Sequence, residues 1–427
     1  MKIIVVGAGI SGLCLYLFLK KYLSTSLPPD EPLEILIYEK HDDNVPRSGD
    51  IIIGGFLAIA PNGVKAIRDL DEELYKDIRS KGTDQGVFNL KSANGWELGK
   101  FGAQSYDDPP LKSVAISRQR LWECFRNRVP NDAITQVPVH QVSFDDNSAA
   151  TLRFGEGVQP QTADLIIGAD GVHSATRKAV AKDEGDYSAQ YVGLVGVGGL
   201  LDPKVKLPAP TPPGSMTLTF GANGFFGYGP TADEEFGWWS TYALSEPPSS
   251  NKAIDVEDVK AQLQSRHKDW QDPNIQTFIA NVEIDSVYPT WVCPKMPKWS
   301  KGNLVLVGDA AHAMQPSSGQ GVSQALEDCQ VLSILLGHYV GKQDRPKSIE
   351  QALTQYERIR RPRVQKCVDR GNRSGDQKRA MGKVKEYMMY GFVWAMTRWP
   401  KDSWGAYLYG NNPGDEARAF IEKEKGK

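Results

Sequence analysis

The N-terminal residues carry the spacing Gly-x-Gly-x-x-Gly directly after an apolar, strand-like run. The chain begins MKIIVVGAGISG, so the three glycines are Gly7, Gly9 and Gly12. The first allows a tight turn, the second lets backbone approach phosphate oxygens, and the third lets a helix pack closely on the strand. The helix start, at Ile10 and Ser11, offers free N–H groups and a positive dipole end to an anion. This pattern predicts a dinucleotide pyrophosphate site.

The next strand-like run, residues 33–39, ends in a carboxylate that suits the ribose of an adenosine. Glu39 closes LEILIYE, and the polar loop 24–32 explains why it lies further from Gly12 than the usual interval of about 20 residues. A carboxylate here accepts ribose hydroxyls and disfavours a 2′-phosphate. We place Lys40 in the same site. A secretory leader is disfavoured, because glycines interrupt the apolar run and no small-residue cleavage site follows.

A second carboxylate and a second glycine turn narrow the choice of dinucleotide. Asp309 closes the buried strand-like run 303–309, so it is expected at the carboxyl edge of a sheet, where cofactors bind. There it can accept hydrogen bonds from a sugar-alcohol chain. Gly319 and Gly321 allow close backbone approach and open a second helix, whose N-terminus stabilises negative charge on a reduced flavin. Because NAD has no ribityl chain, these features predict FAD.

The composition of the chain argues against several kinds of partner and site. The 427 residues contain 50 lysines and arginines against 52 aspartates and glutamates, which gives no case for binding nucleic acid or an anionic membrane. The 5 cysteines are scattered without a C-x-x-C, so neither a disulfide framework nor a metal site is predicted, and the setting is expected to be reducing and cytoplasmic. No apolar run reaches the ~18 residues of a transmembrane helix.

Hydrophobic spacing predicts the elements that position these residues. Val64, Ile67, Leu70 and Leu74 recur at helical spacing and predict one helix over residues 62–81. Turn signals and alternating apolar runs predict the strands. The other predicted elements are a hairpin around Asn94-Gly95, strands on both sides of 145–147, a buried strand in 163–168, antiparallel strands at 191–195, 216–220, 225–228 and 237–242, and helices at 118–128, 256–269, 321–336 and from about 348 onward.

A sequence rich in Gly, Pro and aromatics separates two stretches of α/β character. The predicted fold class is therefore α/β, with a Rossmann-like FAD-binding domain interrupted by an antiparallel β-sheet substrate domain and followed by C-terminal helices. The predicted segments are 1–80, 113–180 and 299–345 for the FAD-binding domain, 81–112 for a hairpin contributing to the substrate domain, 181–298 for that domain, and 346–427 for the helical region.

Three motifs occur in an order that resembles the class A FAD-dependent monooxygenases, including salicylate-hydroxylase-like, zeaxanthin-epoxidase-like and fungal secondary-metabolite enzymes. They are the glycine turn with Glu39, then GADGVHSATR at 168–177, then the segment 308–321. Asn62-Gly63, the stretch 117–121 and the helix at 356–363 also fit the family. The resemblance covers residues 1 to about 370.

The resemblance implies a role for each matching residue. Arg118 is expected at the phosphate or ribityl region, Asp170 at FAD and at transiently bound NAD(P)H, and Asp309 at the ribityl chain. No catalytic residue is predicted, and His173 and His312 are expected to satisfy backbone groups. The expected cofactor contacts are Gly7, Gly9, Ile10, Ser11, Gly12, Glu39, Lys40, Arg47, Arg118, Asp170, Asp309, Pro316, Gly319, Gly321 and Val322.

The chain contains one dinucleotide fingerprint. The glycines of 196–199 precede Leu-Leu-Asp-Pro and no helix, so they predict a glycine-rich strand. The resemblance therefore implies that NADPH or NADH enters the FAD cleft transiently and reduces the flavin. O2 then gives a C4a-hydroperoxide, whose distal oxygen passes to the substrate, while the protein positions and shields the reaction.

Aromatic residues of the sheet domain are the candidates for the substrate pocket. The strand at 191–201 lacks the arginine that anchors a phenolate in some fungal relatives, which favours a bulky, largely apolar and electron-rich aromatic or alkene substrate. The stretch 387–404 is expected to pack as an amphipathic helix across the two lobes, with a pocket cap or a dimer contact as alternatives. The pocket candidates are Phe225, Phe226, Tyr228, Trp238, Trp239, Tyr242 and Trp291.

We therefore predict a flavin-dependent, NAD(P)H-dependent monooxygenase that hydroxylates or epoxidises a small molecule of secondary metabolism with O2. It is expected to be a monomer or homodimer without a nucleic-acid partner or a transmembrane segment. Two alternatives stay open: an FAD oxidase or dehydrogenase that needs no NAD(P)H, and a non-catalytic flavoprotein. Reduction of the flavin by a nicotinamide cofactor separates them from the monooxygenase.

Overall fold

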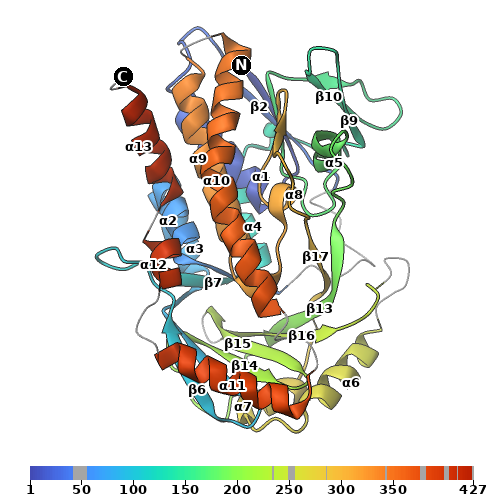
Figure 1. The fold of residues 1–427 in the computed structure, drawn as a ribbon, viewed down its shortest axis with the longest axis vertical. Helices are drawn as coiled ribbons and strands as arrows, with labels where there is room; N and C mark the ends of the chain where they lie inside the picture. The colour runs from blue at the N-terminus through green and yellow to red at the C-terminus, as the bar shows by residue number, and fades with distance from the viewer. Residues whose placement is uncertain are drawn as a thin grey trace.

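The computed structural model describes residues 1–41, 55–232, 235–248, 255–284, 286–341, 344–375, 381–398, 403–410 and 412–425. One sheet is parallel throughout, apart from its β18–β19 edge (Figure 1). Its strands come from distant parts of the chain, because Ile3 pairs with Leu165 and Ile166 pairs with Leu304. The strand order is β18 (Ser300–Lys301), β19 (Leu304–Leu306), β12 (Leu165–Gly168), β1 (Lys2–Val6), β2 (Glu34–Tyr38) and β8 (Ile134–Thr135).

Helix α9 (Gly321–Tyr339) is the centre of the helical layer beside this sheet (Figure 1). Most of its residues are buried, including two carboxylates, Glu327 and Asp328. A helix buried on nearly all sides must have neighbours all round it. These neighbours are α1 (Ile10–Leu23), α2 (Pro61–Leu70), α10 (Arg345–Gly375) and α13 (Pro413–Lys425).

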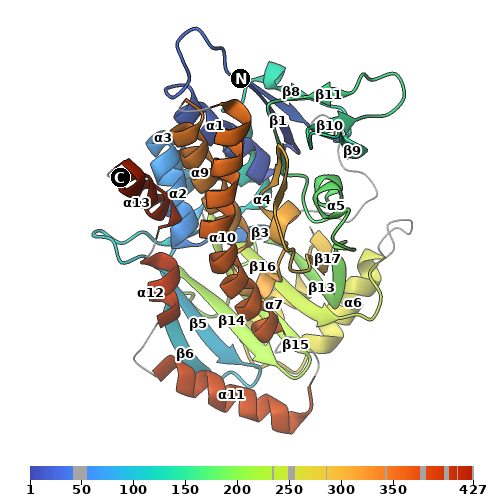
Figure 2. The same ribbon diagram turned by 45° about the horizontal axis from the view of Figure 1, so that its top comes forward.

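The second large sheet is antiparallel, except where β14 runs parallel to β5 (Figure 2). Two helices, α6 (Val256–His267) and α7 (Pro273–Ala280), pack on one face. Helix α11 (Lys383–Arg398) packs on the other face through Leu90 and Leu218. The strand order is β17 (Ser286–Val292), β13 (Gln190–Leu201), β16 (Glu235–Ala243), β15 (Gly224–Ala232), β14 (Ser215–Gly221), β5 (Val87–Ser92) and β6 (Glu97–Gly102). The predicted hairpin is thus β5–β6, and the glycines of 196–199 lie within β13.

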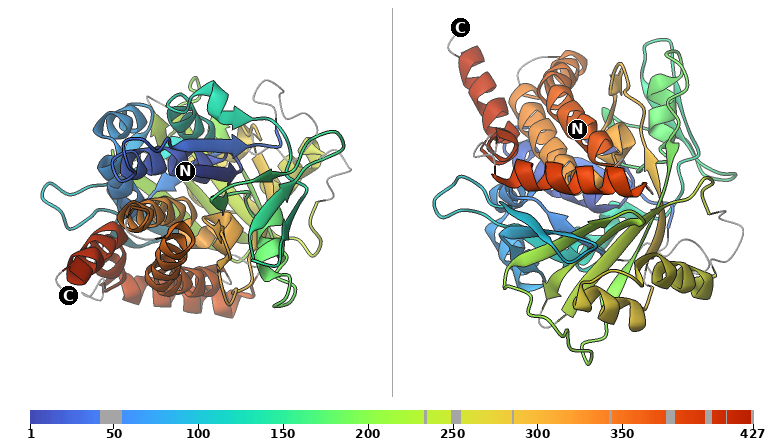
Figure 3. Two further views of the ribbon diagram at one scale, coloured as in Figure 1. Left: turned by 90° about the horizontal axis from the view of Figure 1, so that it is seen from above. Right: turned by 60° about the horizontal axis from the view of Figure 1, so that its bottom comes forward.

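Shorter elements complete the two layers (Figure 3). One three-stranded sheet consists of β3 (Phe56–Ile59), β7 (Ser113–Ser117) and β4 (Thr83–Gln85), and another of β11 (Gln161–Thr162), β10 (Ala150–Arg153) and β9 (Gln141–Phe144). The remaining helices are α3 (Glu72–Ser80), α4 (Arg118–Arg126), η1 (Asn131–Ala133), α5 (Ala175–Ala181), α8 (Asp309–His312), η2 (Pro316–Ser318) and α12 (Ser403–Tyr409). Among the described residues, no helix is both long and apolar enough to cross a bilayer.

The prediction of a single helix over 62–81 is wrong. Asp71 is extended, with φ −160° and ψ 120°, and it separates α2 from α3. Its carboxylate accepts hydrogen bonds from the N–H groups of Glu73 and Leu74. These bonds cap α3, and such local side-chain bonding competes with continuation of a helix. The apolar spacing persists across the break because both helices bury one face in the same core.

Candidate active site

Four predicted cofactor segments meet at one edge of the parallel sheet. Gly7 follows β1, Glu39 follows β2, Asp170 follows β12 and Asp309 follows β19. Because these four strands are neighbours and run in the same direction, their carboxyl ends lie side by side. The structure therefore brings together residues that are far apart in the sequence, at the edge where a dinucleotide is expected.

In the first glycine turn, two glycines are packed against backbone and the third borders free space. Gly7 has φ +105°, and a Cβ there would lie 2.5 Å from the carbonyl oxygen of Ala169. A Cβ on Gly12 would lie 1.9 Å from the carbonyl oxygen of Gly7, so the helix and the turn are in direct contact. A Cβ on Gly9, in contrast, would meet no protein atom within 4 Å. This exposed backbone, at the start of α1, fits a pyrophosphate group.

The predicted adenosine acid is held against the glycine turn. One carboxylate oxygen of Glu39 accepts a hydrogen bond of 2.6 Å from the N–H of Ala8, and the other accepts one of 3.0 Å from His41. Trp122 of α4 donates from its indole N–H to the carbonyl of Ala8 at 2.9 Å. Arg118 is exposed one turn before Trp122, on the same face of α4, and Lys40 is exposed beside Glu39. Glu39 and Trp122 therefore both hold the first glycine turn, while contact of Arg118 and Lys40 with a cofactor stays a prediction.

The Asp-Gly motif has a structural role in its own loop. The carboxylate of Asp170 accepts hydrogen bonds of 2.6 Å from the hydroxyls of both Ser174 and Thr176, and one of 3.0 Å from the N–H of Thr176. Direct contact between Asp170 and a cofactor stays a prediction. Arg177, which sequence reasoning did not single out, is buried and donates to the carbonyls of Asp309 at 3.3 Å and Ala310 at 3.1 Å. It thus joins the second and third motifs.

The third motif presents a helix N-terminus to open space. Gly308 has φ +57°, and a Cβ there would lie 2.7 Å from the hydroxyl of Ser11. Asp309 is exposed at the start of α8. A Cβ on Gly319 or Gly321 would meet nothing within 4 Å, and the second of these begins the 19-residue helix α9. The open space before this helix fits an electron-rich ring system.

The other predicted contacts of this region are Pro316, which is exposed at the start of η2, and Val322, which is half-buried in the first turn of α9. Ile10 and Ser11 are half-buried in the first turn of α1. Arg47 lies outside the described residues.

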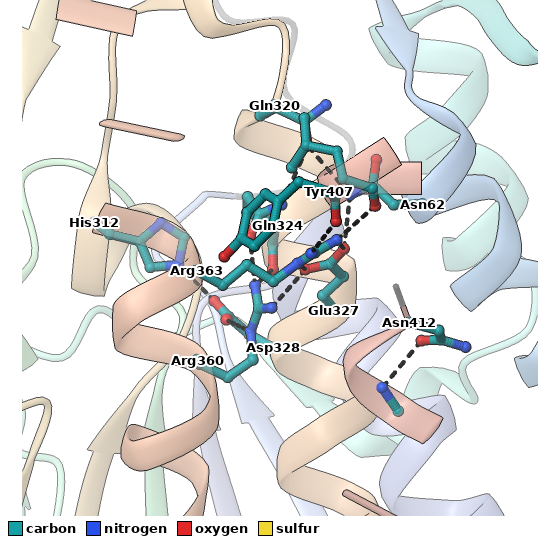
Figure 4. Close-up of polar contacts among 12 residues, drawn as sticks. Asn62, His312, Gln320, Gln324, Glu327, Asp328, Arg360, Arg363, Tyr407 and Asn412 are labelled. Atoms are coloured by element: carbon teal, nitrogen blue, oxygen red, sulfur yellow. Dashed lines mark hydrogen bonds and ion pairs between the residues drawn. The ribbon is translucent and has the colours of Figure 1, made fainter. Parts of the chain in front are cut away.

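Behind the third motif, a buried network of charges joins α9 to α10 (Figure 4). Asp328 accepts hydrogen bonds from the N–H of Gly308 at 2.9 Å, from His312 Nε2 at 2.6 Å and from Arg360 Nε at 2.8 Å. Glu327 pairs with both Arg360 and Arg363. The network thus fixes the Gly308 turn from behind. Sequence reasoning missed it, although two adjacent acids in an apolar helix were a signal.

The arginines keep both buried carboxyls ionised. Burial alone would raise the pKa of Glu327, but Arg363 and Arg360 lower the pKa below its ordinary value. Burial would likewise raise the pKa of Asp328, and His312 and Arg360 lower it. The surrounding charges therefore outweigh desolvation at both carboxyls, as buried ion pairs require.

The aromatic pocket candidates do not all lie on the same face of the second sheet, because side chains alternate along each strand. Phe226, Tyr228, Trp238 and Tyr242 face the helices of the second sheet and pack in one core with residues such as Leu263 and Phe278. Successive strand residues point to opposite faces, so Phe225 and Trp239 lie on the other face. Their ring centroids are 5.6 Å apart. Trp291 is half-buried and contacts the ring of His173 at 5.0 Å, beside the Asp-Gly loop. We retain Phe225, Trp239 and Trp291 as pocket candidates.

Two further aromatic residues belong to this face. Phe56, at the start of β3, contacts Trp239 edge to face at 5.1 Å. A Cβ on Gly237 would lie 2.3 Å from the ring of Phe56, and one on Gly196 would lie 2.2 Å from the ring of Tyr288. The glycines therefore let large rings lie flat against the sheet. Desolvation raises the pKa of Tyr288 to about 12, so its hydroxyl stays protonated at neutral pH.

Comparison with known proteins agrees with this geometry. Residues 133–371 match the FAD binding domain family. The chain is 27% identical to the chloroplastic zeaxanthin epoxidase of Nicotiana plumbaginifolia, over 85% of this chain and 53% of that protein. It is 26% identical to the 3-amino-4-hydroxybenzoate 2-monooxygenase of Streptomyces cremeus, over 88% of this chain and 87% of that protein. The chain therefore spans about half the length of the epoxidase.

A solved structure shows the same fold. Klebsiella pneumoniae HpxO, complexed with FAD and uric acid, matches with a TM-score of 0.72 and 22% sequence identity, over 99% of this chain and 96% of that chain. The match to the FAD binding domain family identifies FAD as the dinucleotide of the site.

Proposed function

Because this chain belongs to the class A FAD-dependent monooxygenases, we propose that it uses NADPH or NADH and O2 to insert one oxygen atom into a bulky, largely apolar substrate. The second oxygen atom would leave as water, and the nicotinamide would supply the two electrons. The chemistry that bound FAD supplies is hydride acceptance and O2 activation. The protein's own residues bind and orient FAD, exclude water and hold the substrate.

The observation that carries the substrate class is the composition of the sheet face. The strands β13, β15, β16 and β17 contain one charged residue among their described positions, Glu235. Arg120 donates to both of its oxygens, at 2.8 and 3.0 Å, so this charge is paired. An apolar face with a paired charge at its edge favours an uncharged, electron-rich aromatic or alkene substrate.

This face adjoins the predicted flavin cradle. Strand β3 begins at Phe56, and just beyond its end the N–H of Ala60 donates to the hydroxyl of Ser323 in α9 at 3.0 Å. A substrate on the aromatic face would therefore lie near the N-terminus of α9. Transient use of NAD(P)H is supported by the single glycine fingerprint, since the glycines of 196–199 lie in strand β13.

Flavin reduction tests this function. Purified yellow protein, mixed anaerobically with NADPH or NADH, is expected to lose its absorbance near about 450 nm, and faster when a neutral indole, polyketide or prenylated alkene that binds is present. Admission of O2 should then give one oxygenated product per nicotinamide oxidised. Reduction by substrate alone would indicate the oxidase or dehydrogenase. Failure of both nucleotides with every substrate would overturn the monooxygenase.

Variants of two adjacent tryptophans, Trp239 and Trp238, distinguish an effect on substrate binding from an effect on stability. Replacing Trp239 with alanine is expected to raise KM for an apolar substrate by at least about 10-fold, because the loss of an aromatic contact surface exceeds about 1.4 kcal/mol. FAD content should not change. Steady-state kinetics and flavin absorbance check both statements.

The control for that variant is Trp238→Ala, on the opposite face of the same strand. Trp238 is buried against α6 and α7, so this variant is expected to lose about 3–5 kcal/mol of stability and to shift KM little. If Trp239→Ala left KM unchanged, or if both variants shifted it equally, the aromatic face would not be the substrate wall.

A further inference from the structure

Helix α11 exposes an unusual concentration of large apolar side chains. Val384 is 76% exposed, Met388 is 69% exposed and Phe392 is 60% exposed. Six of the eleven large apolar residues exposed in the described chain lie on this helix, and Trp96 of the β5–β6 turn contacts Tyr387 at 5.8 Å to extend the same surface. The docking face, as we call it, consists of Trp96, Val384, Tyr387, Met388, Phe392, Trp394 and Met396.

The helix itself is firmly attached to the second sheet. Met389, Tyr390 and Val393 pack with Leu90 and Leu98 in a small core. The Tyr390 hydroxyl accepts a hydrogen bond from the N–H of Ala93 at 3.3 Å, and the Thr397 hydroxyl donates to the carbonyl of Leu98 at 3.0 Å. Figure 2 shows α11 along the lower border of the molecule, beneath β5, β6 and β14. Its inner face is therefore satisfied, while its outer face is also apolar. Large apolar side chains gathered on the exposed face of an attached helix mark an interaction surface.

The charges that accompany the docking face are positive. Lys383, Lys385 and Arg398 are exposed on α11. The one acid of the helix, Glu386, is buried and accepts hydrogen bonds from the N–H of Ala222 and from the hydroxyl of Tyr390. On the neighbouring strand, Glu97 pairs with Lys100 at 3.2 Å. Local charge thus departs from the near-neutral balance of the whole chain, which had given no case for an anionic membrane.

We propose that α11 docks this protein onto an anionic membrane surface. Aromatic and methionine side chains on one face, beside lysine and arginine, are the features of helices that lie in the headgroup region without crossing the bilayer. Each basic residue near an anionic leaflet adds attraction that salt screens. The docking face would enter the lipid, and the sheet would hold α11 in a fixed orientation.

A second copy of this chain is a less suitable cover. The 16 residues of α11 rise about 24 Å at 1.5 Å each and present a face about 10 Å wide, hence about 240 Å². Stable protein interfaces bury about 800 Å² on each partner. The like charges of Lys383, Lys385 and Arg398 would also approach their own copies across a two-fold axis. Both arguments favour lipid over self-association.

A row of rings connects the docking helix to the proposed substrate face. Phe220, which packs beside the α11 core, lies 5.3 Å from Phe225, and Phe225 lies 5.6 Å from Trp239. Since Phe225 is 3% exposed, these rings are packed on one another, and the row places the proposed substrate face next to the helix that would meet an apolar, membrane-dissolved substrate. This role for the row rests on the proposed function, whereas docking itself does not.

Vesicle binding tests the docking without any catalytic step. The FAD-loaded protein is expected to co-sediment with vesicles of phosphatidylcholine and phosphatidylglycerol, and at least about 10-fold less with phosphatidylcholine alone. Met388→Glu/Phe392→Glu should reduce binding to anionic vesicles by at least about 10-fold, since burying two carboxylates is unfavourable. Lys383→Glu/Lys385→Glu should weaken binding to anionic vesicles and remove most of its salt dependence.

The matched control is Val158→Glu, because Val158 is 42% exposed in the loop between β10 and β11, away from α11. It should bind vesicles like the wild type, and all variants should keep their flavin absorbance. Sedimentation velocity measures whether the protein is a monomer or a dimer and so tests the alternative, a contact between copies. If the wild type is a dimer that ignores vesicles and Met388→Glu/Phe392→Glu is a monomer, the docking face is a contact between copies and the proposal is wrong. Absence of vesicle binding in a monomeric wild type would overturn it as well.

Discussion

Replacing Arg360 with methionine is expected to lower the free energy of unfolding by about 3–5 kcal/mol at neutral pH. Arg360 is fully buried and pairs with both Glu327 and Asp328, so its removal leaves two carboxylates without their shared partner. Because Asp328 also accepts from the N–H of Gly308, FAD should dissociate more readily. Urea unfolding of the variant and the wild type measures the first effect, and flavin fluorescence on dilution measures the second.

The neighbouring arginine provides the control for that experiment. Arg361 is half-exposed and pairs with Glu357 at 3.3 Å, so Arg361→Met should cost less than about 1 kcal/mol. Equal effects of the two variants would show that the buried network contributes no more than a surface pair.

The penalty in Arg360→Met should depend on pH with a definite sign. The lowered pKa values of Glu327 and Asp328 mean that their stabilising effect is present above the unfolded carboxyl pKa of about 4 and is lost as pH falls through the folded values. In the variant Glu327 keeps only Arg363 and Asp328 keeps only His312, so both carboxyls should protonate more readily than in the wild type. The difference in stability between the two proteins should therefore be largest near neutral pH and should shrink in acid.

Alanine at Gly12 is expected to abolish folding or FAD retention, whereas alanine at Gly9 should weaken FAD binding alone. A Cβ on Gly12 would lie 1.9 Å from the Gly7 carbonyl oxygen, which forces the backbone to move and should cost at least about 3 kcal/mol. A Cβ on Gly9 would meet no protein atom within 4 Å but would occupy the space proposed for the pyrophosphate.

The two glycine variants are distinguished by measuring stability and affinity separately. The apo form of Gly9→Ala should unfold within about 1 kcal/mol of the wild type, yet bind FAD at least about 10-fold more weakly. Soluble Gly12→Ala with normal FAD content would contradict the close contact between turn and helix. Unchanged affinity in Gly9→Ala would place the pyrophosphate elsewhere.

Local order explains why much of the cofactor site could be predicted from the sequence. A β-branched run, a glycine turn and a helix are contiguous in residues 2–23, and each signal supports the next. The strand that precedes Asp309, the glycine turn at 319–321 and helix α9 are also close together in the sequence, so they could be predicted for the same reason. Phe225 with Phe226, and Trp238 with Trp239, show what was overlooked: neighbours in a strand cannot share a face, so alternation alone could have divided them.

Other parts of the site depend on contacts that no local pattern encodes. Arg177 belongs to a visible motif, but its partners are carbonyl groups at Asp309 and Ala310, more than a hundred residues later. Phe56 joins the aromatic face because β3 lies beside the second sheet. The break at Asp71 could not be predicted from apolar spacing, because that spacing continues without interruption from α2 into α3. The one local signal was Asp71 itself, a residue that can cap a helix.

The strand order of the parallel sheet also determines when this protein can acquire its cofactor. A chain is synthesised from its N-terminus, and β1 finds its partner β12 only after Leu165 has emerged, and β12 finds β19 only after Leu304. The charge network that supports the third motif waits still longer, for α10. The glycine turn is thus synthesised before β12, β19 and α10, which complete the site around it. A nascent chain that ends before Leu304 would expose an unpaired edge of β12, and one that ends before Arg363 would lack the charge network. Chaperone demand should therefore fall, and flavin uptake begin, only after α10 has emerged.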